Sequence, residues 1–332
     1  MSRFKLGRTA PHPEATHPRL RLGDALTSYP PAPSVVDYIG KVADWPMYGN
    51  DQLGDCTCAA IAHMLEAWTA YGQGSTVRVT DGDVVKLYEA VGGYRPGDPS
   101  TDQGANMQDV LAHMRKTGIA GHKILAFASV DIHNAAELAA AMALFGHIYV
   151  GVNLPNNAQD QFGHGEPWSV QPDDGGIEGG HAICWGYAAK GENNKVITWG
   201  AVQEATPAWF NTYVEEAWIV ISQEWINKVG ENPEGIDLAK LGAAFTAMTG
   251  EASPFRPASQ PAPVDPADTA LVAALTPWLG ARHVGINAAA AHDVLIWMAA
   301  RGYVPASVTS GVHHGLNMVG DSIPEAAFGD TE

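Results

Sequence analysis

The chain has 332 residues, a hydrophobic fraction of 46% and ten tryptophans, the composition of a globular protein long enough for about two domains. Its 36 acidic residues outnumber its 19 basic ones, which gives a formal net charge of −17. A phosphate backbone or an anionic membrane surface would repel such a chain, so the composition argues against nucleic acid and membrane as partners.

Residues 1–31 contain several prolines and little periodicity, so we expect an extended N-terminal arm. This segment lacks the apolar stretch of a secretory signal, and no window offers the roughly 18 apolar residues of a membrane span. We therefore expect a cytoplasmic protein. Its three cysteines are too few for a disulfide framework and should be reduced.

Helical periodicity begins at the first two cysteines, Cys56 and Cys58. Within residues 56–71 the apolar Ile61, Leu65 and Trp68 recur three and four positions apart, which predicts a helix with Asp55 as its N-cap. Three further helices are predicted at residues 82–91, 106–118 and 134–146.

The pattern then changes to short runs of β-branched and aromatic residues, separated by turn-forming residues. These runs predict strands at 148–154, 181–187, 195–202 and 216–222. Helices followed by strands indicate an α+β fold rather than an alternating parallel sheet. We interpret the adjacent Glu215 and Glu216 as a solvated edge before the last strand.

The C-terminal region has a different composition. Residues 252–266 are rich in proline, which is typical of a semi-rigid linker, and two helices are predicted beyond it, at 267–282 and 287–302. A helical module of this size is marginally stable alone, so we expect it to lean on the main domain or to serve self-association or docking to a partner. The predicted division is an arm (1–31), a main domain (32–230), a connecting segment with the linker (231–266) and the C-terminal module (267–332).

Cys56 and His181 are the candidate reactive pair. A helix N-terminus stabilises a thiolate, and a nearby imidazole can take the proton of the thiol. His181 stands in "GIEGGHAICWGY", where glycines give the backbone room beside the strand that carries the ring. The structural alternatives are a small cysteine tolerated at a helix start and a histidine packed in the core.

The stretch "VVDYIGKVADWPMYGNDQLGDC" resembles the segment that leads into the catalytic helix of the papain-like cysteine peptidases. Aligned without a gap, the resemblance implies Cys56 as the nucleophile and Asn50 as the amide that helps bind the oxyanion. A register shift of two residues would instead select Cys58 and Gln52. The other matched positions are Val36, Asp37, Lys41, Ala43, Pro46 and Glu66.

Later segments resemble the same family in the same order. "DQGANMQDVLAHMRKTGI" resembles the stretch that lines the cleft, which implies Gln103 and Gly104 as substrate contacts. "GGHAICWGY" resembles the histidine strand and "ITWG" the family's "NSWG", which implies His181 as the base and Gly180 and Trp199 as further contacts. The resemblance spans roughly residues 32–225 and implies a papain-like fold, with a helical half that carries the catalytic helix and an antiparallel sheet or barrel half.

One position departs from the family. Ile197 stands where papain-like enzymes have the asparagine that orients the imidazole, and a hydrocarbon cannot accept the ring N–H. Thr198 is a weak candidate for this role if the strand is turned by one residue, which would reverse the face of each side chain. The third member of a triad often contributes less than the other two, so this departure is compatible with weakened activity or with none.

Three functions are considered. The first is a thiol hydrolase that cleaves peptide or peptide-like amide bonds without a cofactor. The second is an inactive papain-like module with a binding or structural role, including association with phage virions, because similar sequences of the family occur in actinobacteria and their bacteriophages. The third is a metal site, which is disfavoured because structural zinc sites prefer a two-residue gap between paired cysteines. Its candidate ligands are Cys56, Cys58 and His63, with His181 or Cys184.

Overall fold

The computed structural model describes residues 4–17, 19–25 and 33–222, together with residues 225, 243, 246 and 252. The chain divides into two units, Met1–Ala258 and Ser259–Glu332, and all the described residues belong to the first. The predicted C-terminal module and most of the predicted connecting segment lie outside the described residues, so both stay predictions.

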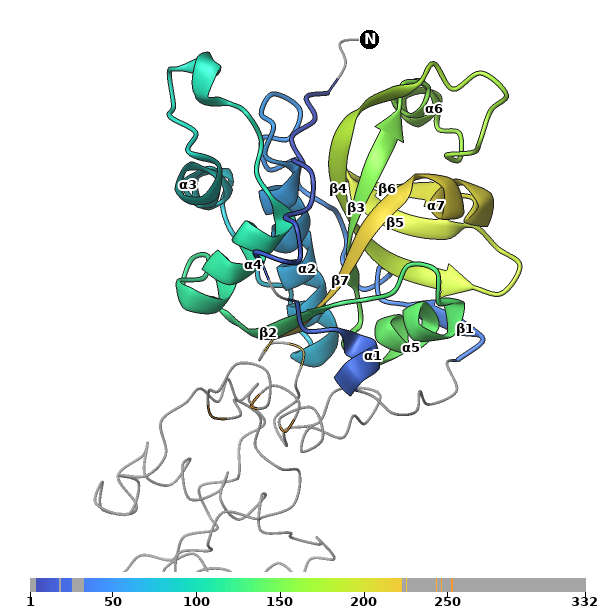
Figure 1. Cartoon of the computed structure of the whole chain (residues 1–332), viewed down its shortest axis with the longest axis horizontal. Helices are drawn as coiled ribbons and strands as arrows, with labels where there is room; N and C mark the ends of the chain where they lie inside the picture. Colours follow the sequence, from blue (N-terminus) through green and yellow to red (C-terminus); the bar gives the residue numbers. More distant parts are fainter. Residues whose placement is uncertain are drawn as a thin grey trace, which may run out of the picture. The chain divides into compact units, whose positions relative to one another are not determined.

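One half of the described structure is helical (Figure 1). It contains α2 (Cys56–Gly72), α3 (Asp81–Gly92) and α4 (Met107–Lys116), which confirm three of the predicted helices. Nearly every residue of α2 is buried, so α2 is a core helix with neighbours on all sides. Thr80 starts α3 with a capping box that it shares with Asp83, and Asn106 caps α4 by accepting a hydrogen bond from the N–H of Gln108.

The other half is built on an antiparallel sheet with the strand order β2-β7-β3-β4-β5-β6, and β1 pairs with β4. The α+β layout is therefore confirmed. The predicted strand 195–202 is two strands, because the chain turns at Trp199 and Gly200, which have φ values of 45° and 70°. The strands are β1 (Val35–Asp37), β2 (Ile124–Ser129), β3 (Ile148–Pro155), β4 (Ile177–Ala189), β5 (Asn194–Thr198), β6 (Ala201–Ala205) and β7 (Val214–Ser222).

The remaining helices are α1 (Leu22–Ala25), α5 (Ala135–Phe145), α6 (Ala158–His164), α7 (Pro207–Tyr213) and the 3-10 helix η1 (Pro99–Thr101). Helix α5 was predicted, whereas α6 and α7 are too short to show a helical period in the sequence. None of the helices in the described ranges is long and apolar enough to cross a bilayer.

The two halves meet where the start of α2 packs against the sheet. Helix α2 contacts β3, β4 and β5, and the hydroxyl of Tyr149 donates a hydrogen bond of 2.8 Å to the carbonyl of Thr57 in the first turn of the helix. On β4, His181 pairs with Val152 of β3. This packing brings the N-terminal end of α2 to the strand that carries His181.

The N-terminal arm runs between the two halves before it reaches α1 (Figure 1). The N–H of Arg8 donates to the carbonyl of Gly180 on β4 at 3.0 Å, and the N–H of Thr9 donates to the carbonyl of Ala105 at 3.1 Å. The N–H of Ala105 in turn donates to the carbonyl of Gly7 at 2.8 Å. The arm therefore forms backbone hydrogen bonds with both halves, a placement that the sequence did not predict.

Candidate active site

Cys56 is the first residue of α2 and is buried. Hydrogen bonds from the backbone N–H groups of Ala182 and Gly7 favour its thiolate, but burial opposes them and is the larger effect. The pKa of Cys56 is therefore raised to about 11, so the group is a neutral thiol. Ala182 directly follows His181, so the sulfur contacts the backbone of the strand that carries the histidine.

His181 is fully buried on β4, with its two ring nitrogens in different surroundings. Nε2 lies 2.7 Å from Oγ1 of Thr198, whereas Nδ1 has no hydrogen-bond partner among the described residues. The tautomer in which Nε2–H donates to Thr198 leaves the lone pair of Nδ1 free to take a proton. Burial, together with the charge of Arg8, lowers the pKa of His181 to about 3, so the ring is neutral.

Thr198, rather than Ile197, lies beside the imidazole. Ile197 is fully buried and pairs with Cys184 across the β4–β5 ladder. Thr198 is the last residue of β5, and its hydroxyl faces His181 just before the chain turns at Trp199. The indole of Trp199 stacks on the imidazole with 4.6 Å between the ring centroids. A hydroxyl and an aromatic face therefore hold the ring on two sides.

The loop before α2 places the two candidate oxyanion amides differently. Asn50 is buried, and its Nδ2 donates to the carbonyl of Leu53 at 3.3 Å and to Oδ1 of Asp55 at 3.2 Å. Gln52 is exposed, and its amide donates to the carboxylate of Asp51. Of the two side chains, only that of Asn50 is buried beside the start of α2.

Asp55 lies at the N-cap position but makes no side-chain capping bond, so the predicted capping role is wrong. Its carboxylate accepts from Asn50 instead of from the first turn of the helix. Burial raises the pKa of Asp55 well above its usual value, and the hydrogen bond from Asn50 offsets this only in part.

The other thiols belong to the core. Cys58 and Cys184 are fully buried, and burial raises the pKa of each well above its usual value. His63 is buried with its Nε2 2.7 Å from the carbonyl of Pro46. Among the described residues, no cluster of three or more histidine, cysteine or acidic side chains could hold a metal ion. Of the three cysteines, Cys56 is the one whose thiol contacts the arm, through the backbone of Gly7.

The backbone of the arm fills the groove at Cys56. A methyl group on Gly104 would lie 2.0 Å from the carbonyl oxygen of Gly7, and one on Gly180 would lie 2.1 Å from that of Arg8. Both distances are far below van der Waals contact, so the absence of side chains at these two positions lets the arm approach. The arm lies against two of the glycines that the resemblance implies as substrate contacts.

Side chains of the arm hold it along the groove. The ring of Phe4 stacks on Trp199 at 4.8 Å and meets Phe162 edge to face at 5.7 Å. On the helical side, Nζ of Lys5 is 2.5 Å from the buried carboxylate of Asp102. Of the four expected substrate contacts, Gly104, Gly180 and Trp199 therefore contact the arm.

Gln103, the fourth expected contact, is exposed, and its amide donates to the carbonyl of Ser100 at 2.8 Å. The structure records no hydrogen bond between Gln103 and a described residue of the arm, although Gln103 directly precedes Gly104.

Arg8 is the main feature that sequence reasoning missed. Its guanidinium is buried and forms ion pairs of 2.9 Å with Glu216 and 2.5 Å with Glu215. The interpretation of these two glutamates as a solvated edge is wrong for Glu216, which is only 5% exposed, because Arg8 supplies the charge that allows its burial. Two adjacent acidic residues at a strand start were the available signal, but nothing local linked them to the arm.

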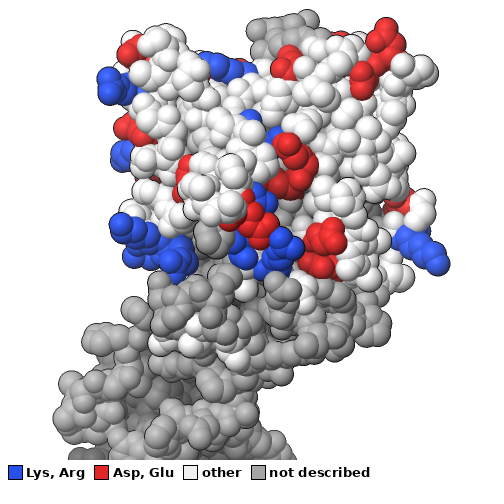
Figure 2. Space-filling model, in the orientation of Figure 1, with Lys and Arg blue, Asp and Glu red and all other residues white. Residues whose placement is uncertain are grey.

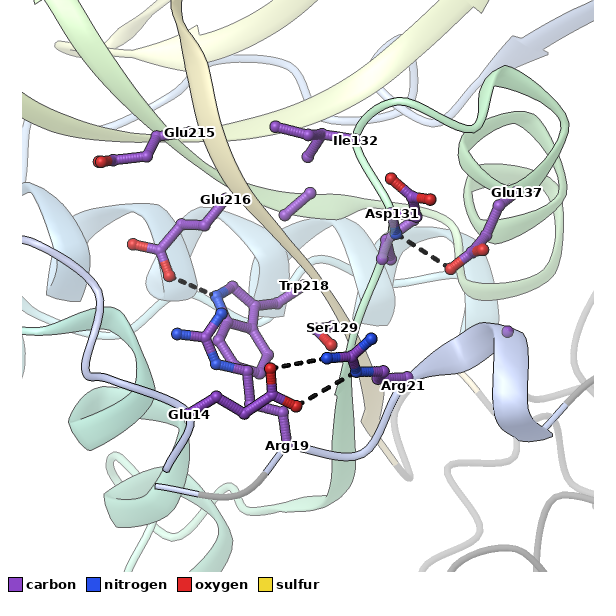
Figure 3. Close-up of a pocket in the computed structure, with 13 residues that line it drawn as sticks. Glu14, Arg19, Arg21, Ser129, Asp131, Ile132, Glu137, Glu215, Glu216 and Trp218 are labelled. Atoms are coloured by element: carbon purple, nitrogen blue, oxygen red, sulfur yellow. Dashed lines mark hydrogen bonds and ion pairs between the residues drawn. The ribbon is translucent and has the colours of Figure 1, made fainter. Parts of the chain in front are cut away.

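A cavity of about 440 Å³ lies beside the arm rather than at Cys56 (Figure 3). Its lining includes Glu14, Arg19, Arg21 and Gly23 of the arm, residues 129–132 at and after the end of β2, Glu137 of α5, and Glu215, Glu216 and Trp218 of β7. Acidic and basic side chains gather in the middle of this face of the molecule, where the arm passes between the two halves (Figure 2). At the thiol, the backbone of the arm occupies the groove.

Comparison with solved structures identifies the fold. The structure is similar to that of xylellain, a cysteine protease from Xylella fastidiosa, with a TM-score of 0.51 and 13% identity over 67% of this chain and 98% of xylellain. Weaker similarity is found to procathepsin L 3 of Tenebrio molitor (TM-score 0.46, 13% identity, 61% of this chain and 74% of that chain). The ragweed cysteine protease Amb a 11 in its proform gives a TM-score of 0.45 at 16% identity, over 63% of this chain and 72% of that one.

No protein-family model matches the sequence, and a search of curated proteins gives no significant match. The identity to the solved structures is low, so the likeness speaks for the fold alone. The described part of the chain has the α+β fold of the papain-like cysteine proteases, as its motifs predict.

Proposed function

We propose that this chain is a papain-like cysteine hydrolase of peptide bonds, and that its own N-terminal arm closes the cleft in the present state. The observation that carries the proposal is the surroundings of His181. One ring nitrogen is held by Thr198 at 2.7 Å, the other is free, and the sulfur of Cys56 contacts the backbone of the next residue, Ala182. A thiol beside a base that a third group orients is the arrangement needed for nucleophilic catalysis.

The proposed roles follow from these positions. Cys56 attacks the peptide carbonyl carbon, and its proton passes to Nδ1 of His181. The resulting imidazolium protonates the departing amine as the C–N bond breaks and a thioester forms. Water then adds to the thioester with His181 as base, releasing the acid and restoring the thiol. Thr198 positions the ring throughout, because its hydroxyl accepts the N–H of Nε2.

The oxyanion requires hydrogen-bond donors near the start of α2. The backbone N–H of Cys56 is one of the first N–H groups of the helix, which have no partner within the helix. Asn50 is the proposed side-chain donor, and it would exchange one of its bonds, to Leu53 or Asp55, for a bond to the oxyanion. A missing oxyanion donor typically costs about 10²–10³ in rate.

The closed state does not favour the thiolate–imidazolium pair. Burial raises the pKa of Cys56 to about 11 and lowers that of His181 to about 3, so both groups are neutral. When the arm leaves, water reaches both groups and the cost of charging them falls. The pKa of the thiol then decreases and that of the imidazole increases, which favours proton transfer. On this proposal the arm suppresses the reactivity of the site.

The test uses the full chain carrying Gly7→Ala, here called the opened chain. A methyl group at residue 7 would lie 1.8 Å from the carbonyl oxygen of Gly54, so the arm cannot keep its place. We expect the opened chain to cleave fluorescein-labelled casein, Cys56→Ala in that chain to abolish cleavage, and Cys58→Ala to leave it. Cleavage that survives Cys56→Ala, or an opened chain that is exposed at Cys56 yet inert, would contradict the proposal.

The alternative is a papain-like module that binds or assembles without turnover, including a role in a phage virion. The observation in its favour is that the arm contacts both walls of the groove, as a permanent part of the fold would. In that case the opened chain would be inactive, and Cys56→Ala would leave co-purification with its assembly unchanged.

A further inference from the structure

The pocket that holds the side chain of Arg8 places two carboxylates against one guanidinium. The side chain is 1% exposed, and each terminal nitrogen of the guanidinium meets a different carboxylate: Nη1 lies 2.9 Å from Glu216 and Nη2 lies 2.5 Å from Glu215. Nη2 also donates to Oδ1 of Asn153 at 2.9 Å and to the carbonyl of Val152 at 3.3 Å. Four acceptors from β3 and the start of β7 thus surround one cation.

The walls leave space for the aliphatic part of an arginine. A methyl group at Gly151 on β3 would lie 2.8 Å from Cδ of Arg8, so a larger residue there would push the side chain out. The same methyl group would lie 2.8 Å from the sulfur of Met107 on α4, which forms part of the opposite wall. The pocket therefore lies between the helical half and the β half, at the groove itself.

The charge of the pocket requires a cationic occupant. Glu216 is buried, and the indole N–H of Trp218 donates to its Oε2 at 2.8 Å, so a second contact besides Arg8 orients its carboxylate. With the pocket empty, this buried carboxylate would face Glu215 with no cation between them, which is costly. The planar guanidinium, which offers several N–H groups in a fixed geometry, suits these acceptors better than an ammonium group.

The pocket is close to the reactive pair. The backbone of Arg8 bonds to Gly180, and its neighbour Gly7 donates to the sulfur of Cys56. The charge of Arg8 influences the titration of both Cys56 and His181. Glu215 and Glu216 also line the cavity beside the arm (Figure 3).

We propose that this pocket is a specificity subsite for an arginine side chain of a peptide substrate, with Glu216 as its main determinant and Glu215 as its second. The proposal rests on the proposed hydrolase and names its substrate class: peptides with arginine next to the residue that lies over Cys56. In the present structure the arm's own arginine occupies the subsite.

The test is made on the full chain with Arg8→Ala, which vacates the subsite. Two capped peptides copy residues 4–10, one with arginine and one with citrulline, which has nearly the same shape but no charge. Their ability to protect Cys56 from iodoacetamide is measured by mass spectrometry, a readout that does not need turnover. We expect the arginine peptide to protect at a concentration at least about tenfold lower, the difference expected for a charge-assisted hydrogen bond.

Glu216→Gln in the same chain should remove the difference between the two peptides, whereas Glu192→Gln, an exposed carboxylate on another loop, should preserve it. Equal protection by both peptides, or protection by neither, would overturn the subsite. If the arginine peptide protects selectively but no peptide is ever cleaved, the hydrolase proposal fails and the subsite stands. As a check that does not use Arg8→Ala, Glu216→Gln with the native arm should speed labelling of Cys56, and unchanged labelling would count against the proposal.

Discussion

His181 and His147 are both fully buried next to the β3–β4 strand pair, at different positions along it. His181 pairs with Val152 near the end of β3, whereas His147 directly precedes the first residue of that strand. Each ring has its Nε2 near an oxygen, Thr198 Oγ1 at 2.7 Å for His181 and the carbonyl of Tyr38 at 3.0 Å for His147. In both, Nδ1 has no hydrogen-bond partner among the described residues, and burial lowers the pKa to about 3.

The difference lies in what covers each ring. His147 is packed among core residues, with Tyr38 at 5.9 Å and Trp225 at 6.5 Å between ring centroids. His181 is stacked on Trp199, and its two chain neighbours contact other elements: Gly180 bonds to Arg8 of the arm, and the backbone of Ala182 contacts the sulfur of Cys56. Burial and a lowered pKa are therefore common to both rings, and His181 differs by having the thiol of Cys56 and the arm at the residues next to it.

The strongest contrast should come from replacing each ring by glutamine in the opened chain. His181→Gln removes the base, and loss of general base catalysis typically costs about 10²–10⁴ in rate. His147→Gln keeps a donor for the carbonyl of Tyr38 and should leave turnover within a few-fold, at some cost in stability. Casein cleavage rates report both. Similar losses of cleavage in the two variants would contradict a specific catalytic role for His181.

The next largest effect is expected from displacing the N-terminal arm. Gly7→Ala should increase the rate at which iodoacetamide labels Cys56 about a hundredfold, because the overpacking cannot be relieved while the arm stays in place. Gly82→Ala is the control, since the nearest recorded neighbour of a methyl group there is Oγ1 of Thr80 at 3.7 Å. Labelling of Cys58 and Cys184 should stay slow. Faster labelling of all three thiols would mean that the fold has loosened rather than opened.

Two threonine variants can separate the role of Thr198 in holding the His181 ring from the general cost of losing a buried hydroxyl. Thr198→Val and Thr69→Val each remove a buried hydroxyl, that of Thr69 being bonded to the carbonyl of Leu65 at 2.9 Å. Both should cost about 1–3 kcal/mol of unfolding free energy, measured by urea denaturation. Only Thr198→Val should also slow the opened chain, by about tenfold, because Nε2 of His181 loses its acceptor. An equal turnover in the two variants would remove Thr198 from the proposed mechanism.

The smallest difference between the two histidines is expected in the pH dependence of stability, which both should affect alike. Their folded-state pKa values of about 3 lie below the unfolded value of about 6.5, so between these pH values the unfolded chain binds more protons. Each histidine therefore removes stability as the pH falls from 6.5 towards 3, at up to about 1.4 kcal/mol per pH unit. In the closed chain, His181→Gln and His147→Gln should each reduce this slope by a similar amount, measured by urea denaturation at several pH values.

The sequence predicted the framework well because its core elements are locally encoded. Helix α2 and strands β3, β4 and β7 are long apolar runs with clear helical or strand composition, and the order of motifs gave the fold class. Strands β1 and β2 were missed because each depends on a partner strand far away in the chain. Asp55 has the right residue type for an N-cap, but its carboxylate accepts a hydrogen bond from the amide of Asn50 instead of capping the helix.

The candidate site was predictable only where a motif marked it. Thr198 lies beside His181, and Cys56 contacts the backbone of the residue after His181, although the shift from Ile197 to Thr198 depends on where β5 ends. The arm was expected to be extended, but nothing in residues 4–10 indicates that they follow the groove. Contacts such as that of Arg8 with Glu216 depend on the folded topology, and a single sequence does not contain that information.

Glycines line both the arm and the walls of the groove. Substitutions at these glycines can therefore distinguish binding of the chain's own arm from binding of other peptides. A methyl group at Gly104 or Gly180 would narrow the walls for any extended peptide that enters. A methyl group at Gly7 would be carried away with the arm when it leaves, and the walls would remain as they are. A methyl group at Gly7 thus weakens binding of the arm alone, whereas a methyl group at Gly104 or Gly180 weakens binding of every peptide that enters the groove.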